Sequence, residues 1–451
     1  MFRAKVGMAR AVASLSRASG RGGGTTLPGR MLLAVQPDAI GRLALGLRQG
    51  SVVISATNGK TTTAKMAAAI LSPPLHLTRN TAGANLASGI ASALVRDHDA
   101  DLGVFEVDEA ALDGVVGGLE PRLVVLGNLF RDQLDRYGEL ELIAARWRAM
   151  CERLPAGAGL VSNADDPLVA SIGRDRAGHT WFGLDDPAAA LPEMQHASDS
   201  KWCVRCGARY AYRSIYLGHL GDWTCPSCGD ARPALEVAAR DIASDGLDAV
   251  RFRLCTPQGD ATVRLPLPGV YNVYNALAAA ALALRAGAGL DQVRAGLERF
   301  SAAFGRFERV QLGAVDAVLL LVKNPAGANE VIRTLAGDGH RKTLLVALND
   351  RIADGRDVSW IWDVDFELLA AQAERVVCTG TRAAEMGMRL KYADVPEQRI
   401  EVEPDMATAV DRVSAAASGT AYLLATYTAM LDLRGLLEQR GLVRPYWEEA
   451  A

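Results

Sequence analysis

Short apolar runs separated by helix-forming stretches occupy the first part of the chain, and several of these runs end in polar turns. The first run, 52–54, leads through a polar turn into the helix-forming segment 64–71. Further runs lie at 104–107, at 123–126 and near Val161. Apolar strands that alternate with helices indicate a parallel sheet, and polar turns after such strands indicate a site at the strand ends. The pattern therefore predicts a doubly wound α/β fold.

The same pattern restarts in the last third of the chain. Apolar runs at 317–322, 343–348, 375–378 and 421–426 again alternate with helical stretches. This repeat predicts a second, smaller Rossmann-like α/β domain. We therefore expect a basic N-terminal segment, a central domain and a C-terminal domain, at residues 1–50, 51–302 and 303–451.

The polar turn after the first run has the features of a phosphate-binding loop. Gly59 allows backbone N–H groups to close around a polyphosphate, Lys60 can neutralise the outer phosphates, and Thr61 can hold Mg²⁺. Ile54 stands where the usual motif has a further glycine. The alternative is a threonine-rich helix N-terminus with a satisfied cap and no ligand. We predict that this loop binds ATP.

The run at 104–107 leads into three carboxylates, Glu106, Asp108 and Glu109. In a phosphate-loop fold, a carboxylate at the end of a neighbouring strand can share Mg²⁺ with a loop threonine and the nucleotide oxygens. The alternative is an ordinary acidic loop. The apolar lead-in favours the metal site.

Four of the seven cysteines form two C-x-x-C pairs, and eighteen residues separate the pairs. Two such pairs can surround Zn²⁺ with four thiolates, which lets a segment without a core of its own fold. A disulfide pairing conflicts with the cytoplasmic location expected below. We predict a structural zinc ribbon at about 200–232, whose ligands are Cys203, Cys206, Cys225 and Cys228.

Charge and hydropathy limit which classes of protein this chain can belong to. The net charge of −3 gives no overall bias toward nucleic acid, although residues 1–50 hold eight Lys or Arg against one acid. A helix at about 2–18 could touch an anionic membrane surface or pack on its own domain. Because apolar runs of membrane-spanning length and a signal peptide core are both missing, we expect a cytoplasmic protein.

Three later motifs complete an ordered set with the phosphate loop and the carboxylates: N-x3-DQLDRYG at 128–138, SNADDP at 162–167 and G-x2-N-x2-N at 269–275. Together they resemble the central ATPase domain of the Mur ligase superfamily, which makes amide bonds by phosphorylating a carboxylate. The cysteine insert and three C-terminal motifs narrow the resemblance to the MurT family, the synthetase subunits of lipid II isoglutaminyl synthases. These motifs are FGR at 304–306, KNPAGANE at 323–330 and DGRDVSWIWD at 354–363.

The resemblance implies roles for particular residues. Mg²⁺ would be held by Thr61 and Glu106, and Asn272 or Asn275 would lie near the adenine or ribose. Gln133 replaces a metal-binding histidine of most members and Arg146 a carbamylated lysine, which argues against the usual second Mg²⁺ site. Arg146 could instead carry charge near the phosphates or pack on a helix surface. The implied contacts to ATP come from Thr57, Asn58, Gly59, Lys60, Thr61 and Thr62, and Lys60 and Glu106 are the catalytic candidates in this loop region.

The resemblance also implies a partner, a GatD-like class I glutamine amidotransferase that releases ammonia for amidation of the D-glutamate α-carboxylate of lipid II. The sequence agrees with such a division of labour between two subunits, because it lacks a Cys-His-acid set with the local signature of a glutaminase. An aspartate of this chain, Asp354 or Asp357, would complete the partner's Cys-His-Asp triad. The alternative is that these aspartates cap a helix that begins near Ser359.

Two other functions remain open. A single-chain amino-acid ligase of the same superfamily would act without a partner. A nucleic-acid module built on the zinc ribbon would use Lys201, Arg205, Arg209 and Arg213, although the net acidic charge opposes it. About fifty residues precede the phosphate loop, too few for the UDP-binding domain of full-length Mur ligases. We therefore expect a substrate held in another way, such as a lipid-linked muropeptide at the inner face of the plasma membrane.

Overall fold

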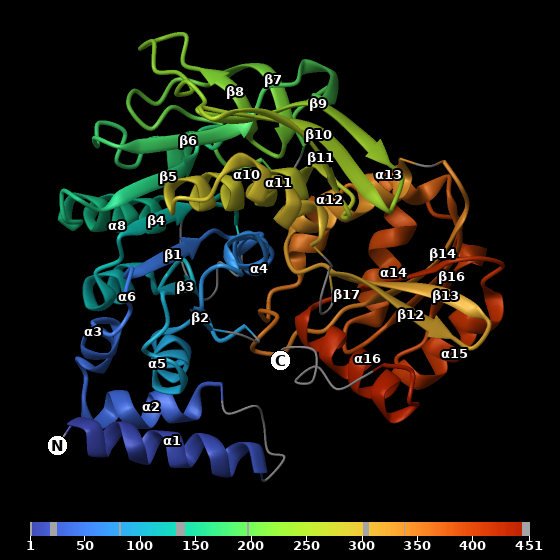
Figure 1. Ribbon diagram of the computed structural model, residues 1–451. Helices are drawn as coiled ribbons and strands as arrows, with labels where there is room; N and C mark the ends of the chain where they lie inside the picture. Colours follow the sequence, from blue (N-terminus) through green and yellow to red (C-terminus); the bar gives the residue numbers. More distant parts are fainter. Residues whose placement is uncertain are drawn as a thin grey trace.

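A computed structural model describes residues 2–18, 25–80, 83–131, 140–195, 198–300, 306–337 and 339–443 (Figure 1). Gln133 and the first two residues of the FGR motif lie outside these ranges. Two large sheets organise the described chain, and each is covered by helices on both faces. The doubly wound α/β fold is therefore confirmed.

The larger sheet has nine strands in the order β11-β10-β9-β6-β5-β4-β1-β3-β2. Neighbouring strands from β2 to β9 pair in parallel, whereas β10 and β11 extend the sheet by antiparallel pairing. β1, β3, β4, β5 and β6 are buried throughout, as expected for parallel strands with helices on both faces. The strands are β1 Ser51–Ser55, β2 Leu77–Arg79, β3 Leu102–Glu106, β4 Leu123–Leu126, β5 Gly159–Asn163, β6 His179–Leu184, β9 Val237–Asp245, β10 Ala249–Thr256 and β11 Gly259–Leu265.

Alternate residues of β1 contact opposite helical layers. Val52 and Ile54 pack with one cluster that includes residues of α4, α10 and α11, whereas Val53 packs with the cluster of α5, α6 and α8. This alternation follows from the two-residue period of a strand. The helices are α3 Ala39–Ala44, α4 Lys60–Leu71, α5 Ala87–Arg96, α6 Leu112–Leu119, α8 Leu140–Arg153, α9 Pro167–Ala170, α10 Val270–Arg285 and α11 Leu290–Glu298.

The basic N-terminal segment begins with helix α1, Phe2–Ala18, which confirms the helix predicted at about 2–18. Val6 and Ala9 are buried against the same layer as α2, Leu27–Val35, and α5. Arg10 Nε donates to Val95 O at 2.8 Å. The helix therefore packs on the protein itself. Within the described ranges, every helix is too short or too polar to cross a bilayer.

The smaller sheet has six strands in the order β12-β13-β17-β14-β15-β16, and all pairs except β12–β13 are parallel. Helices α12, α13 and α14 cover one face, and α15 and α16 cover the other. The predicted Rossmann-like domain is thus present, whereas the exact domain boundaries stay predictions. The elements are β12 Arg306–Leu312, β13 Val315–Leu321, α12 Pro325–Ala336, β14 Lys342–Ala347, η2 Ser359–Asp363, α13 Glu367–Ala370, β15 Ala373–Thr379, α14 Ala383–Tyr392, η3 Glu397–Arg399, β16 Ile400–Val402, α15 Met406–Ala416, β17 Ala421–Ala425 and α16 Tyr427–Gln439.

A separate two-stranded hairpin lies between β6 and β9 in the sequence. Its strands are β7, Ala211–Leu217, and β8, Leu220–Thr224, and the short 3-10 helix η1, Pro187–Ala189, precedes it. The four cysteines flank this hairpin on both sides in the sequence. Figure 1 shows the hairpin at the top of the molecule, above the larger sheet.

Candidate functional site

The phosphate loop connects β1 to α4, and glycine is required at its last position. Gly59 precedes α4 with φ of 91°, a left-handed conformation that L side chains rarely adopt. A Cβ atom at Gly59 would lie 1.9 Å from Asn275 Oδ1 on α10. The loop can therefore approach α10 closely only because this residue has no side chain.

Two asparagines from distant segments hold the loop. Asn58 N donates to Asn128 Oδ1 at 2.9 Å, and Asn128 Nδ2 donates to Asn58 O at 3.0 Å. Asn324, which caps α12 of the smaller sheet, donates from Nδ2 to Asn58 Oδ1 at 3.0 Å. The loop is thus fixed both to the end of β4 and to the second domain.

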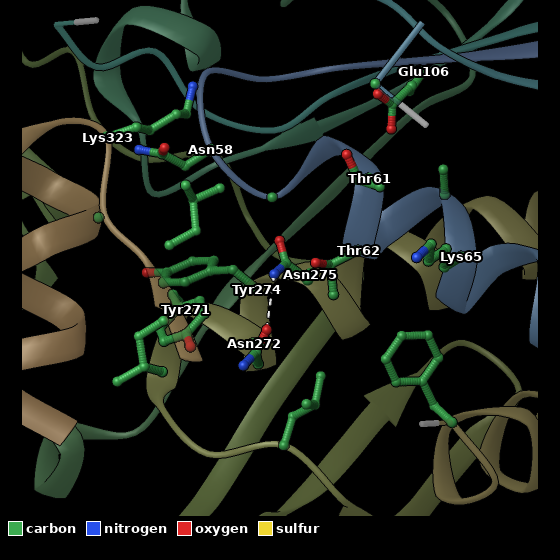
Figure 2. A pocket seen from close by; sticks show the side chains of 18 of the residues that line it. Asn58, Thr61, Thr62, Lys65, Glu106, Tyr271, Asn272, Tyr274, Asn275 and Lys323 are labelled. Carbon is green, nitrogen blue, oxygen red and sulfur yellow. Dashed lines mark hydrogen bonds between the residues drawn. The ribbon is translucent and has the colours of Figure 1, made fainter. Parts of the chain in front are cut away.

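A cavity of about 1070 Å³ opens beside the loop, between the larger and the smaller sheet. Figure 2 shows α4 and α10 on one side and the segment that carries Lys323 on the other. The cavity is large enough for a nucleotide together with part of a second substrate. Cationic side chains from both halves of the molecule line it: Lys65, Arg79, Arg299, Lys323 and Arg434.

Most of the predicted ligand residues lie on the cavity wall, namely Asn58, Gly59, Thr61, Thr62, Glu106, Asn272 and Asn275. Thr57 and Lys60 instead contact the protein around the loop. Thr57 Oγ1 accepts a hydrogen bond from Phe130 N at 3.1 Å. Lys60 Nζ lies 2.6 Å from Glu109 Oε2.

The Lys60–Glu109 ion pair is almost completely buried, with side-chain exposures of 9% and 4%. Burial alone would raise the pKa of Glu109, but the nearby charges of Lys60 and Lys323 outweigh it and lower that pKa. Glu109 is therefore ionised and holds Lys60 beside the loop. A polyphosphate would have to compete with this carboxylate for the ammonium group.

The donors at Thr61 and Glu106 fit a hard divalent cation. A hydroxyl and a carboxylate are oxygen ligands of the kind that Mg²⁺ prefers. Figure 2 shows the Thr61 hydroxyl on the side of α4 that faces Glu106. Asn80 supports this strand end, because its side chain donates to Glu106 O at 2.8 Å and accepts from Glu106 N at 3.0 Å.

Asn272 and Asn275 lie one turn apart at the start of α10. Asn275 Nδ2 donates to Asn272 Oδ1 at 3.1 Å, and Asn272 Nδ2 donates to Pro268 O at 2.7 Å. The aromatic ring of Tyr271 lines the cavity beside them (Figure 2). Amide groups next to an aromatic ring suit a flat, polar heterocycle such as adenine.

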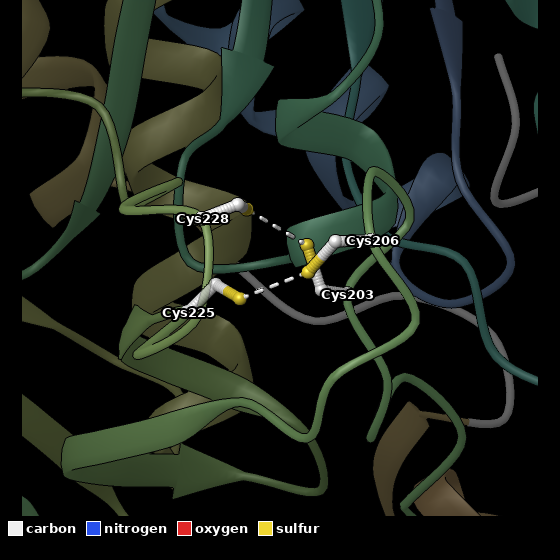
Figure 3. A group of neighbouring side chains, drawn as sticks. All are labelled: Cys203, Cys206, Cys225 and Cys228. Carbon is white, nitrogen blue, oxygen red and sulfur yellow. Dashed lines mark hydrogen bonds between the residues drawn. The ribbon is translucent and has the colours of Figure 1, made fainter.

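The four predicted zinc ligands form one cluster (Figure 3), in which their sulfur atoms all lie within 4.8 Å of one another. Cys203 Sγ lies 3.6 Å from Cys228 Sγ, and Cys206 Sγ lies 3.4 Å from Cys225 Sγ. Four thiolates at such spacings fit a tetrahedral zinc ion with every position filled by protein. The donor set therefore indicates a structural rather than a catalytic site.

The remaining predicted residues lie away from this cavity. Asp354 is buried, and its Oδ1 accepts a hydrogen bond from Thr428 N at 2.7 Å. Asp357 is exposed and accepts a hydrogen bond at 2.8 Å from the N–H of Ser359, the first residue of η2. The N-cap residue of η2 is Val358, so neither aspartate is the N-cap that the alternative predicted. Arg146 is exposed on the surface of α8, in agreement with the surface alternative.

Several contributors could not be found from sequence spacing. Asn128 and Asn324 are 70 and 266 residues from Asn58, so only the fold reveals that they bond to it. The signals that did exist were the polar turn after β4 and the KNPAGANE motif. Glu109 stood in the predicted carboxylate cluster, but its pairing with Lys60 was not expected.

Comparisons with known proteins agree with this geometry. The Mur ligase middle domain family matches residues 54–214, and the MurT ligase C-terminal family matches residues 321–430. The lipid II isoglutaminyl synthase (glutamine-hydrolyzing) subunit MurT of Streptococcus pneumoniae is 32% identical over 94% of this chain and 94% of its own length.

Solved structures support the fold. A pseudomurein peptide ligase type C from Methanothermus fervidus has a TM-score of 0.69 at 22% identity, covering 87% of this chain and 79% of that protein. The MurF ligase of Thermotoga maritima in complex with ADP has a TM-score of 0.65 at 14% identity, covering 93% and 85%. The sequence relationship over nearly the whole chain, together with the shared fold, shows that this chain belongs to the MurT family of Mur-ligase-type, ATP-dependent ligases.

Proposed function

We propose that this chain uses ATP to amidate the α-carboxylate of D-glutamate in lipid II, which yields D-isoglutamine during peptidoglycan biosynthesis. A carboxylate oxygen attacks the γ-phosphorus of ATP, the bond to the β–γ bridging oxygen breaks, and ADP leaves. Ammonia then attacks the carbonyl carbon of the acyl phosphate, loses a proton and displaces inorganic phosphate.

The observation that carries this proposal is the cavity between the two sheets. The phosphate loop borders it on one side, and Lys323 and the first turn of α12 border it on the other. Acyl transfer through a phosphate needs such a site, because water that reached the acyl phosphate would hydrolyse it. The substrate is assigned from relatives named as lipid II isoglutaminyl synthase subunits.

The chain's own residues divide the work of the first step. Asn58, Gly59, Thr61 and Thr62 would cradle the triphosphate with loop N–H groups and hydroxyls. Mg²⁺, held by Thr61 and Glu106, would supply charge neutralisation for the transferring phosphoryl group.

Lys60 would exchange its bond to Glu109 for the outer phosphates. The adenine would lie beside Asn272, Asn275 and Tyr271. Loop N–H groups, metal and lysine together would place positive charge where the phosphoryl group carries negative charge.

Ammonia would come from a GatD-like glutamine amidotransferase subunit, as the words glutamine-hydrolyzing in the relatives' names suggest. Between the two candidate aspartates, Asp357 is better placed to orient a histidine of that subunit, because it is exposed and its hydrogen bond to Ser359 is local. Asp354 is buried and tied to the start of α16.

The test is amidation of lipid II by the full chain with ATP and Mg²⁺. Ammonium chloride or glutamine is supplied as the nitrogen source, each with and without the amidotransferase subunit, and the product is identified by mass spectrometry. We expect amidation with glutamine only when the partner is present. ATP hydrolysis stimulated by free amino acids, without amidation under any condition, would instead support a single-chain ligase.

A further inference from the structure

The hairpin between the two cysteine pairs reaches from the cysteine cluster to the candidate nucleotide cavity. Its base contacts the larger sheet, because Trp223 Nε1 donates a hydrogen bond to Ala164 O at 3.0 Å. The Trp223 ring packs with Cys203 and Cys225 in one apolar cluster. At its other end lies the hairpin tip, residues 216–220. Leu217 and Leu220 of this tip line the cavity, although both are buried.

The tip is in direct contact with Phe130, which lies in the segment that bonds to the phosphate loop. Gly218 has φ of 55°, and a Cβ atom there would lie 2.8 Å from Cε1 of Phe130. The completely buried ring of His219 lies 4.6 Å from the Phe130 ring, centroid to centroid. Phe130 N in turn donates to Thr57 Oγ1 at 3.1 Å, and that hydroxyl donates back to Phe130 O at 3.3 Å. A displacement of the tip would therefore move the phosphate loop.

The tip also holds the opposite wall of the cavity. Arg333 on α12 donates from Nη1 to Tyr216 O at 3.0 Å and from Nη2 to Glu330 Oε2 at 2.8 Å. Glu330 is 2% exposed, lines the cavity and has its pKa raised by burial. The forked guanidinium thus links the hairpin to the helix whose first residues border the phosphate loop.

We propose that the hairpin tip is a positioning element of the nucleotide site, which the four-cysteine cluster holds in register against the phosphate loop and α12. This inference rests on the proposed ATP binding but goes beyond it. It gives the cysteine module, which is the four-cysteine cluster together with the hairpin, a second role besides stabilising its own segment. The module would set the affinity for nucleotide, because both walls of the cavity depend on the position of the tip.

The test compares Gly218→Ala with Gly246→Ala. Gly246, in the β9–β10 turn, has a similar φ of 66°, and a Cβ atom there would meet open space, so both variants carry the same backbone strain. The dissociation constant of Mg²⁺-ADP is measured by calorimetry for the full chain, with bound zinc and thermal unfolding determined on the same samples. We expect roughly a tenfold weaker binding in Gly218→Ala alone, with zinc retained.

A second pair of variants covers the case in which Gly218→Ala does not fold. Arg333→Lys keeps the charge beside Glu330 but loses the fork, whereas Arg213→Lys changes an exposed arginine of β7 paired with Asp222. We expect only Arg333→Lys to raise the KM for ATP, with kcat for lipid II amidation nearly unchanged. Equal nucleotide affinities in the wild type, Gly218→Ala and Arg333→Lys would overturn this inference alone. A wild-type protein that binds no nucleotide would overturn the proposed function as well.

Discussion

Asparagine side chains surround the phosphate loop and hold it through bonds to both its backbone and its side chains. Asn128 and Asn324 bond to Asn58, and Asn275 fills the space left by the missing side chain of Gly59. The need for glycine was predictable, because the strand, turn and helix around it are local. The three asparagine contacts were not, because each joins segments at least 70 residues apart in the chain.

Gly59→Ala should abolish nucleotide binding. The new methyl group would meet Asn275 Oδ1 at 1.9 Å, and the left-handed backbone adds strain of about 1 kcal/mol. Loss of Mg²⁺-ADP binding in calorimetry checks this expectation. Gly313→Ala is the control, since Gly313 has φ of 63° in the β12–β13 turn with open space around it. Undiminished affinity in Gly59→Ala would contradict the assignment of the loop.

His179 should make the protein less stable in acid. Burial lowers its pKa to about 4, although the bond from Nδ1 to Gly173 O at 2.9 Å partly opposes that shift. The unfolded chain binds this proton below about pH 6.5, whereas the folded chain does not until about pH 4. The free energy of unfolding therefore falls as the pH drops through this window, by up to about 3 kcal/mol.

His179→Gln should remove that loss, as measured by urea unfolding at several pH values between 4 and 7.5. Asp165 acts in the opposite direction, because burial raises its pKa to about 6 and the folded state takes up that proton first. The comparison between variant and wild type isolates the histidine. The surface variant His340→Gln controls for the loss of an imidazole, and parallel pH profiles for wild type and His179→Gln would contradict the argument.

The segment between β14 and η2 is fixed at its start and exposed at its end. Asn349 Nδ2 donates to Thr428 Oγ1 at 3.0 Å, and Asp354 accepts from both the N–H and the hydroxyl of Thr428 at the start of α16. The sequence, through its family resemblance, implied a functional aspartate here, Asp354 or Asp357, and the alternative was that these aspartates cap a helix near Ser359. It could not reveal the contact of Asp354 with α16, because 74 residues separate the two partners.

Substitutions of the two aspartates should have different effects, one on stability and the other on glutamine hydrolysis. Asp354→Asn should lower the free energy of unfolding by about 1–2 kcal/mol, because it removes a buried charge that bonds to a helix N-terminus. Asp357→Asn should leave unfolding almost unchanged but reduce glutamine hydrolysis by the two-subunit complex at least about tenfold. Glutamate release and thermal unfolding are measured for both variants. Wild-type glutaminase turnover in both would exclude a triad shared across the subunits.

Among the described residues, several polar contacts around the cavity join the two sheets. Lys323 Nζ donates to Thr57 O at 3.4 Å, Asn324 bonds to Asn58, and Arg131 lies 3.4 Å from Asp363. The repeat of apolar runs predicted both sheets, since that pattern depends on local alternation. The polar contacts between the two sheets depend instead on tertiary packing, so the sequence pattern did not predict them. A polar interface of this kind can open and close around a ligand.

Asn324 should link the contact between the two domains to the binding of nucleotide. Its Oδ1 accepts from Gly327 N at 2.9 Å as the cap of α12, while its Nδ2 bonds to the phosphate loop. Asn324→Ala should therefore cost about 1 kcal/mol as a lost cap. It should also raise the KM for ATP about tenfold with little change in kcat, because the phosphate loop loses its bond to the second domain.

Asp405→Ala separates these two effects. Asp405 caps α15 in the same way, accepting from Thr408 N at 2.8 Å on an exposed helix end of the same domain. Both variants should show similar losses in urea unfolding, but only Asn324→Ala should weaken ATP. Equal KM values in the two variants would mean that Asn324 acts only as a cap of α12 and does not support nucleotide binding.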